Sequence, residues 1–171
     1  MTVDINTGRR KFLGTSITAG AVSVISVHSG NAEAGRPKNT CAAYPVIPIA
    51  EIEQLAKSSV RSFSYPDEYS PCLLVKLDFA ADGGVGPDKN IVAYSSMCTH
   101  MGCFVSYDSS TQTFQCPCHF SIFDPENNGQ MVCGQATENL PRIELSHDTK
   151  TGHIIATGIQ GRLYGRVSNI L

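Results

Sequence analysis

Charged side chains are scarce in this sequence, and tryptophan is absent. Charged residues make up 16% of the 171 residues and hydrophobic residues 42%, a balance that excludes disorder caused by self-repelling charge. The formal net charge is −2, so the chain lacks the basic excess of a nucleic-acid binder, and we expect no nucleic-acid partner. No internal repeat or low-complexity stretch is visible. The length fits one ordinary domain.

An unbroken apolar run that would cross a membrane is also missing. The best candidate, residues 12–32, has no Asp, Glu, Lys or Arg, but several Ser and Thr interrupt it. A membrane span needs roughly 20 apolar residues. The run follows Arg-Arg-Lys at 9–11 and ends at Ala-Glu-Ala, 32–34, which together make the three parts of an export signal. The adjacent arginines resemble a twin-arginine signal.

Residues 1–34 are therefore assigned to a twin-arginine export signal, and residues 35–171 to the mature chain. Export by this route places the protein in the periplasm, an oxidising compartment where disulfides persist. We expect no stable membrane span once the signal is cleaved. An uncleaved signal that keeps the protein at the membrane is the alternative.

The mature chain has the pattern of an all-β domain. Short β-branched and aromatic runs alternate with Gly, Pro, Asn and Asp, which predicts an antiparallel β-sandwich or small barrel. Only Ile49–Ser58 has a helical pattern, and no helical pattern follows the glycines of residues 81–88, which excludes a phosphate-binding loop. The predicted strands are Val46–Ile49, Val60–Tyr65, Cys72–Phe79, Ile91–Ser95, Phe104–Tyr107, Thr113–Gln115, Ile143–Ser146, His153–Gly158 and Leu163–Val167.

Seven cysteines and five histidines are unusual for this length, and six of them fall in two short boxes. The boxes read Cys-Thr-His-Met-Gly-Cys at 98–103 and Cys-Pro-Cys-His at 116–119. Two irons joined by two sulfides need four thiolate or imidazole ligands, and one cysteine and one histidine from each box supply that set. A structural Cys2His2 zinc site is the alternative. Its usual ligand spacing is wider than C-x-H, and it would leave two cysteines idle.

The double box resembles the Rieske iron–sulfur family. The resemblance implies a cluster-binding subdomain at about residues 96–142, formed by two loops that hold one [2Fe-2S] cluster. It implies that Cys98 and Cys116 bind the inner iron and that His100 and His119 bind the outer iron. It also implies a disulfide between Cys103 and Cys118 that ties the loops together. Such a cluster relays single electrons at potentials of about −150 to +300 mV.

The residues after the second box separate the Rieske subfamilies. Respiratory bc-complex subunits continue His-Gly-Ser-x-Tyr-Asp and carry a later Gly-Pro-Ala-Pro loop, whereas this chain reads His-Phe-Ser-Ile-Phe-Asp at 119–124 and has no such loop. Ser121 keeps a hydroxyl that can donate to a bridging sulfide. Phe123 cannot donate to a cysteine sulfur, as tyrosine would. Because the cluster has one hydrogen-bond donor fewer, we expect its reduction potential to be lower than in the respiratory type.

Longer segments resemble the small subunit of arsenite oxidase across most of residues 45–171. They are Tyr65-Pro66-Asp67, Ser70-Pro71-Cys72, residues 83–87, Cys98–Cys103, the run from Gly129 to Arg142, and Tyr164-Gly165-Arg166. The resemblance implies a periplasmic heterodimer with a large molybdopterin subunit that oxidises arsenite to arsenate. Electrons would then pass through the Rieske cluster to a cytochrome c or a cupredoxin. The chain would be the electron-transfer subunit of an oxidoreductase, with no catalytic residue or substrate site of its own.

Two other kinds of Rieske protein remain as alternatives. A subunit of a quinol-oxidising bc-type complex would need an uncleaved anchor and the missing Gly-Pro-Ala-Pro loop. A soluble Rieske ferredoxin that serves a dioxygenase is usually cytoplasmic and lacks the bridging cysteines. The export signal and the pair Cys103 and Cys118 therefore argue against the ferredoxin.

Three cysteines and two histidines of the mature chain have no place in the cluster or the disulfide. We expect Cys72 and Cys133 to be buried thiols, because free cysteine behaves as a small hydrophobe. Cys41 has no assignment. His147 and His153 flank a predicted hairpin turn and are expected to face solvent rather than to bind metal.

Overall fold

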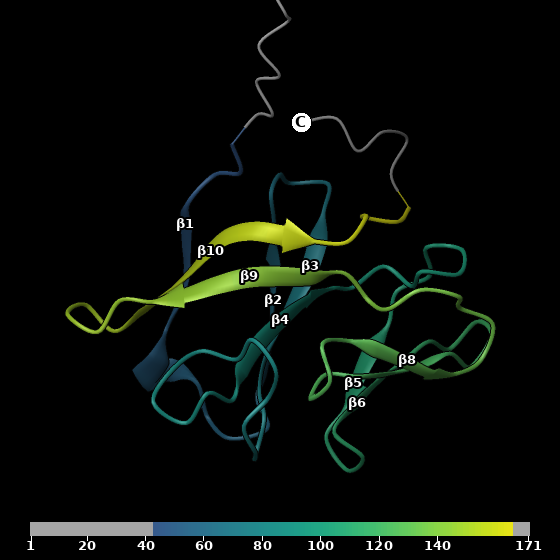
Figure 1. Cartoon of the computed structure of the whole chain (residues 1–171), viewed down its shortest axis with the longest axis horizontal. Helices are drawn as coiled ribbons and strands as arrows, with labels where there is room; N and C mark the ends of the chain where they lie inside the picture. The colour runs from purple at the N-terminus through teal and green to yellow at the C-terminus, as the bar shows by residue number, and fades with distance from the viewer. Residues whose placement is uncertain (1–42, 166–171) are drawn as a thin grey trace, which may run out of the picture. The chain divides into compact units, whose positions relative to one another are not determined.

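The computed structural model describes residues 43–165, and nearly all regular structure in this range is antiparallel β-sheet. The strands form two sheets, one of six strands and one of four (Figure 1). This confirms the predicted all-β class. The predicted export signal and Cys41 lie outside the described residues. Within 43–165, no helix is long and apolar enough to span a membrane.

The larger sheet has the strand order β1-β10-β9-β4-β3-β2, so both ends of the described chain contribute to it. Its central strand β4 is buried at all five positions, which fits its unbroken apolar sequence. β10 alternates buried and half-buried residues, as a strand with one solvent-facing side does. The strands are β1 Ile47–Glu51, β2 Val60–Ser64, β3 Pro71–Lys76, β4 Ile91–Ser95, β9 Arg142–His147 and β10 His153–Gln160.

The smaller sheet is built from residues between β4 and β9, the part of the chain assigned to the cluster-binding subdomain. Its order is β5-β6-β7-β8, and each strand has only three or four residues. Such short strands bury little surface of their own, so the sheet depends on its neighbours. The strands are β5 Ser106–Asp108, β6 Thr113–Gln115, β7 Ile122–Asp124 and β8 Gln130–Cys133.

One apolar core joins the two sheets. Val92 and Tyr94 of β4 pack in the same buried cluster as Phe114 of β6 and Phe123 of β7. The rings of Tyr94 and Phe114 meet edge to face with centroids 5.5 Å apart. The Tyr94 hydroxyl donates to the carbonyl of Pro125 at 2.9 Å, which satisfies its buried polar atom. The small sheet is therefore anchored on the central strand of the large one.

Several predicted boundaries were wrong. The structure has no strand over residues 163–165, and the rest of the predicted strand Leu163–Val167 lies outside the described range. Gly161 has φ +101°, so the chain turns away after β10. The helical pattern at Ile49–Ser58 yields one turn of 3-10 helix, Ile52–Gln54. β7 and β8 were missed, and Phe104 forms only an isolated bridge ahead of β5.

Candidate metal centre

The two cysteine–histidine boxes lie in two tight loops, one between β4 and β5 and one between β6 and β7. In the first loop, the Cys98 amide donates to the Cys103 carbonyl and the Gly102 amide donates to the Cys98 carbonyl, both at 2.8 Å. In the second loop, the Cys116 amide donates to the Ser121 carbonyl at 2.8 Å. Each loop is thus held by hydrogen bonds of its own backbone.

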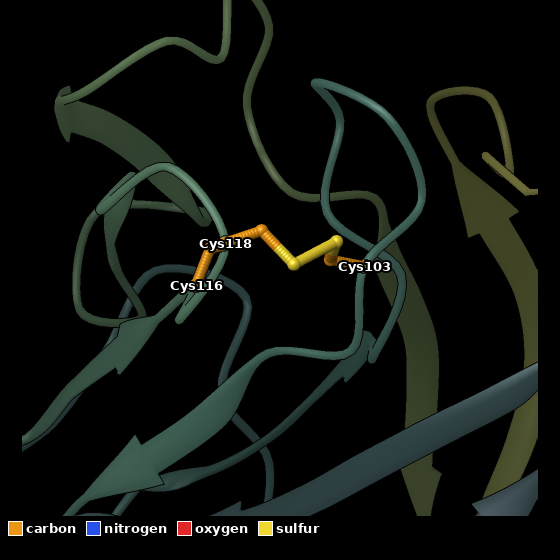
Figure 2. Close-up of side chains that lie close together, drawn as sticks. All are labelled: Cys103, Cys116 and Cys118. Atoms are coloured by element: carbon orange, nitrogen blue, oxygen red, sulfur yellow. A yellow bond between two sulfur atoms is a disulfide. The ribbon is translucent and has the colours of Figure 1, made fainter.

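A disulfide between Cys103 and Cys118 joins the loops, as the family resemblance implies (Figure 2). The sulfur of Cys116 lies within 4.8 Å of both bridged sulfurs. Disulfide sulfurs are not thiolates, so these three residues do not form a three-thiolate metal site. Only Cys116 of this group is free to bind a metal ion.

The remaining donors of the two loops form an inner thiol pair and an outer imidazole pair. Cys98 and Cys116 are 1% and 2% exposed, and the side chain of Cys116 is among the groups that raise the pKa of Cys98. The Nδ1 atoms of His100 and His119 face each other at 3.2 Å, with His119 exposed and His100 half-buried. Two soft buried thiols below two imidazoles near the surface are the donor set that a mixed cysteine–histidine [2Fe-2S] cluster requires.

Burial raises the pKa of the Cys98 thiol. The His100 amide and the Ser121 hydroxyl oppose that shift, because each donates a hydrogen bond to the sulfur. A thiolate at this buried position therefore needs a compensating positive charge, which iron supplies. The electrostatics of the pocket fit a metal-bound Cys98.

Ser121 lies between the second loop and the segment that follows β8. Its hydroxyl oxygen is fully buried and accepts the amides of Gln135 and Ala136 at 3.1 and 3.0 Å. Because those amides occupy the oxygen lone pairs, the hydroxyl hydrogen is left to donate toward Cys98. Gly134 has φ +104°, and a Cβ there would overlap the Ser121 backbone. Glycine is therefore needed for this close approach.

Phe123 is fully buried in the same core cluster as Cys98 and Cys116. It pairs with Phe114 on the neighbouring strand β6. The residue shares this core with the thiol pair, and its phenyl ring has no hydrogen-bond donor. Phe123 therefore fills space in the core and, in addition, cannot donate a hydrogen bond to a cysteine sulfur.

The cysteines outside the boxes gave one correct and one wrong prediction. Cys72 is buried on β3, as expected. Cys133 is exposed, because it ends the edge strand β8, where only one of four residues is even partly buried. His147 and His153 lie at the two ends of the β9–β10 hairpin, half-buried and separate from the boxes. Both histidines are therefore partly open to solvent, and the His153 side chain is 38% exposed.

The sequence analysis missed the exposed apolar side chains around the histidine pair. Met101, Phe104 and Phe120 are 72%, 64% and 77% exposed. Phe120 also has φ +58°, a left-handed conformation that is costly for an aromatic residue. The sequence does contain a feature that predicts this uncharged surface, because residues 96–107 and 109–123 contain no Asp, Glu, Lys or Arg. The loops therefore present an uncharged, apolar surface next to the imidazoles.

The Rieske [2Fe-2S] domain family matches residues 45–144. The chain belongs to this family. Iodate reductase subunit IdrB of Denitromonas iodatirespirans is 37% identical over 164 residues, 94% of this chain and 85% of the relative. The corresponding subunit of Pseudomonas sp. (strain SCT) is 36% identical, over 92% of this chain and 81% of the relative.

Among solved structures, the soluble domain of Rieske protein II (soxF) of Sulfolobus acidocaldarius superposes with a TM-score of 0.65. It is 27% identical and covers 74% of this chain and 84% of its own. The protein is thus an all-β Rieske protein, and the cofactor of its family is a [2Fe-2S] cluster. That cluster supplies one-electron oxidation and reduction.

Proposed function

We propose that this chain is the electron-transfer subunit of a periplasmic molybdenum-containing arsenite oxidase. Cys98, His100, Cys116 and His119 hold its cluster. The observation that carries the electron-transfer part of the proposal is the layered donor set, with buried thiols below imidazoles that reach an uncharged apolar surface. A redox partner can approach the histidines closely there. The arrangement suits a relay.

The chain's own residues have three tasks in this relay. The buried cysteines keep water from the inner side of the cluster. The bridge between Cys103 and Cys118 holds the two loops in register, so that ligand positions change little between oxidation states. His100 and His119 would bind the outer iron and place that edge of the cluster near the surface, where a redox partner can approach.

Arsenite as the substrate rests on the run from Gly129 to Arg142 and on the other segments that resemble the small subunit of that enzyme. Oxidation of arsenite with water yields arsenate, two protons and two electrons. The chemistry would occur at molybdenum in the large partner, and the Rieske cluster would pass the electrons singly to a cytochrome c or a cupredoxin. This chain would contribute no catalytic residue.

A second candidate is an iodate reductase subunit. The observation in its favour is the match of two IdrB subunits over more than nine-tenths of this chain. Electrons would then flow in the opposite direction, from the Rieske cluster toward the partner. A quinol-oxidising bc-type complex is less favoured, because its Gly-Pro-Ala-Pro loop is missing here.

The direction of electron flow decides between the two candidates. The chain is purified without air, together with the partners that it retains, and the cluster is followed by electron paramagnetic resonance (EPR). In an arsenite oxidase, arsenite alone produces the signal of the reduced cluster. In an iodate reductase, arsenite has no effect, and iodate removes the signal after reduction by dithionite. If neither reagent changes a cluster that dithionite reduces, both assignments are wrong.

The proposed export signal has a separate test. Replacement of Arg9 and Arg10 by lysine keeps the charge but removes the twin-arginine pair. We expect the chain and its large partner to stay in the cytoplasm, since the folded pair would be exported together. Immunodetection in periplasmic and cytoplasmic fractions measures this. Unchanged export of the variant would contradict the assignment.

A further inference from the structure

A cavity of about 310 Å³ lies between the start of β9 and the end of β10. Its walls are the segment that leads into β9 (138–142), the segment around the end of β10 (160–162), and Asn128 from the turn before β8. None of the six cysteines and histidines of the two boxes lines it. The volume is at the lower end of the range for small-molecule sites, about 300–1,000 Å³.

Arg142 is one of the residues that line this cavity, and its guanidinium is held in a fixed position. Its Nη1 donates to the carbonyl of Asp82 at 3.2 Å, and its guanidinium packs so closely on Gly83 that a Cβ there would overlap it. Its Nε is buried without a hydrogen-bond partner in the described part of the chain. A partly desolvated guanidinium with so few partners gains from a nearby anion.

Arg162 supplies a second guanidinium from the other wall and is exposed. Neither arginine forms an ion pair among residues 43–165. The carboxylate of Glu138, which also lines the cavity, accepts a hydrogen bond from Tyr164. Burial and this hydrogen bond raise the pKa of Tyr164. The charged side chains of the lining are therefore two arginines and one glutamate. The glutamate carboxylate already accepts a hydrogen bond from the uncharged Tyr164 hydroxyl.

Side-chain amides complete the lining. The Oδ1 of Asn139 accepts the Met131 amide at 3.1 Å, which orients its Nδ2 as a donor. Asn128 and Gln160 add two more amides. The polar side chains of the cavity thus offer more hydrogen-bond donors than acceptors, a balance that suits an oxygen-rich anion.

We propose that this cavity is a binding site for a small inorganic oxyanion of the phosphate and arsenate class. Guanidinium groups bind such ions through paired N–H donors, and the amides contribute further hydrogen bonds. The site lies wholly on this chain. It therefore stands independently of the enzyme to which the chain is assigned under the proposed function.

The test is a calorimetric titration of the full chain, with its cluster, by inorganic phosphate and separately by arsenate at constant ionic strength. We expect saturable binding of one ion per chain. Arg162→Gln should weaken it at least about tenfold, since one charged hydrogen-bond donor is lost. Asn128→Gly should weaken it by about threefold or more, and its φ of +57° accommodates glycine without strain.

The matched control is Arg61→Gln, which removes another exposed arginine from the edge strand β2, outside the cavity. We expect phosphate affinity in this variant to stay within about twofold of the parent chain. The EPR signal of the cluster verifies that each variant is folded. Absence of saturation up to about 10 mM phosphate, or an equal loss in the Arg61 and Arg162 variants, would overturn the proposal.

Discussion

The two sheets of this protein are stabilised in different ways. In the six-stranded sheet, an apolar core holds long strands, and β4 is buried throughout. In the four-stranded sheet, strands of three or four residues depend on a disulfide, on Ser121 and on a shared core with β4. The first region is a scaffold that hydrophobic burial can sustain. The second holds the cofactor site and relies on specific bonds between its loops.

Removal of a proposed ligand gives the largest expected contrast between the regions. Cys116→Ser should abolish the Rieske EPR signal and the bound iron, because the serine hydroxyl is a poor ligand for the cluster. The six-stranded sheet should persist, as measured by far-UV circular dichroism. Cys133→Ser is the matched control, since this thiol is exposed and lies on the same small sheet. Full cluster content in the Cys116 variant would refute its role as a ligand.

The contrast between the regions also explains what the sequence could predict. β4, β6 and the boundaries of most long strands follow from β-branched and aromatic runs, which are local signals. β7 and β8 were missed because Ile122–Asp124 and Gln130–Cys133 are short and lack alternation. Each pairs with the neighbouring strand along the chain, and this pairing, rather than a recognisable run of residues, makes them strands. The burial of Cys133 was misjudged for the same reason, because edge position is a property of the sheet.

The two loops of the candidate site were easier to locate from the sequence than the small sheet that carries them. The boxes at 98–103 and 116–119 are defined by residue type and spacing, so their loops could be located from sequence alone. The Ser121 contacts to Gln135 and Ala136 could not, since they depend on how the segment after β8 folds back. The left-handed backbone conformation of Phe120 could not be predicted from the sequence either, because aromatic residues rarely adopt that conformation.

Loss of the disulfide should weaken the small sheet and leave the large one nearly unchanged. The bridge closes a loop of 15 residues, for which the stabilisation is about 3 kcal/mol. We expect the double variant Cys103→Ser and Cys118→Ser to lose its cluster faster at elevated temperature. Amide hydrogen exchange should rise in residues 96–141 and stay constant in β3 and β4. Equal acceleration in both sheets would show that the regions unfold as one unit.

Alkaline pH should affect the large sheet through Cys72. Its buried thiol donates to the carbonyls of Tyr65 and Ser70, and burial raises the pKa to about 12 from the usual 9.0. The unfolded chain therefore ionises first. This stabilisation is complete below pH 9 and is lost as the pH rises toward 12, by up to about 1.4 kcal/mol per unit.

The measurement is denaturant unfolding of the parent chain and of Cys72→Ala between pH 8 and about 10. The alanine variant is less stable at pH 8 but should show a shallower decline, because it has no thiol to ionise. The difference between the two chains isolates Cys72 from the tyrosines, which also titrate in alkali. Parallel curves would mean that Cys72 does not contribute to the pH dependence.

The smallest expected effect is a tuning of the cluster by a single hydroxyl. Phe123 lies in the core cluster that contains Cys98 and Cys116, so a tyrosine there brings a donor near the thiolates. Phe123→Tyr should raise the reduction potential by about 20–60 mV, the equivalent of one hydrogen bond of about 0.5–1.5 kcal/mol. Ser121→Ala, which removes a donor, should lower it. Potentiometric titration monitored by EPR measures both, and shifts of the same sign would show that repacking, rather than hydrogen bonding, sets the potential.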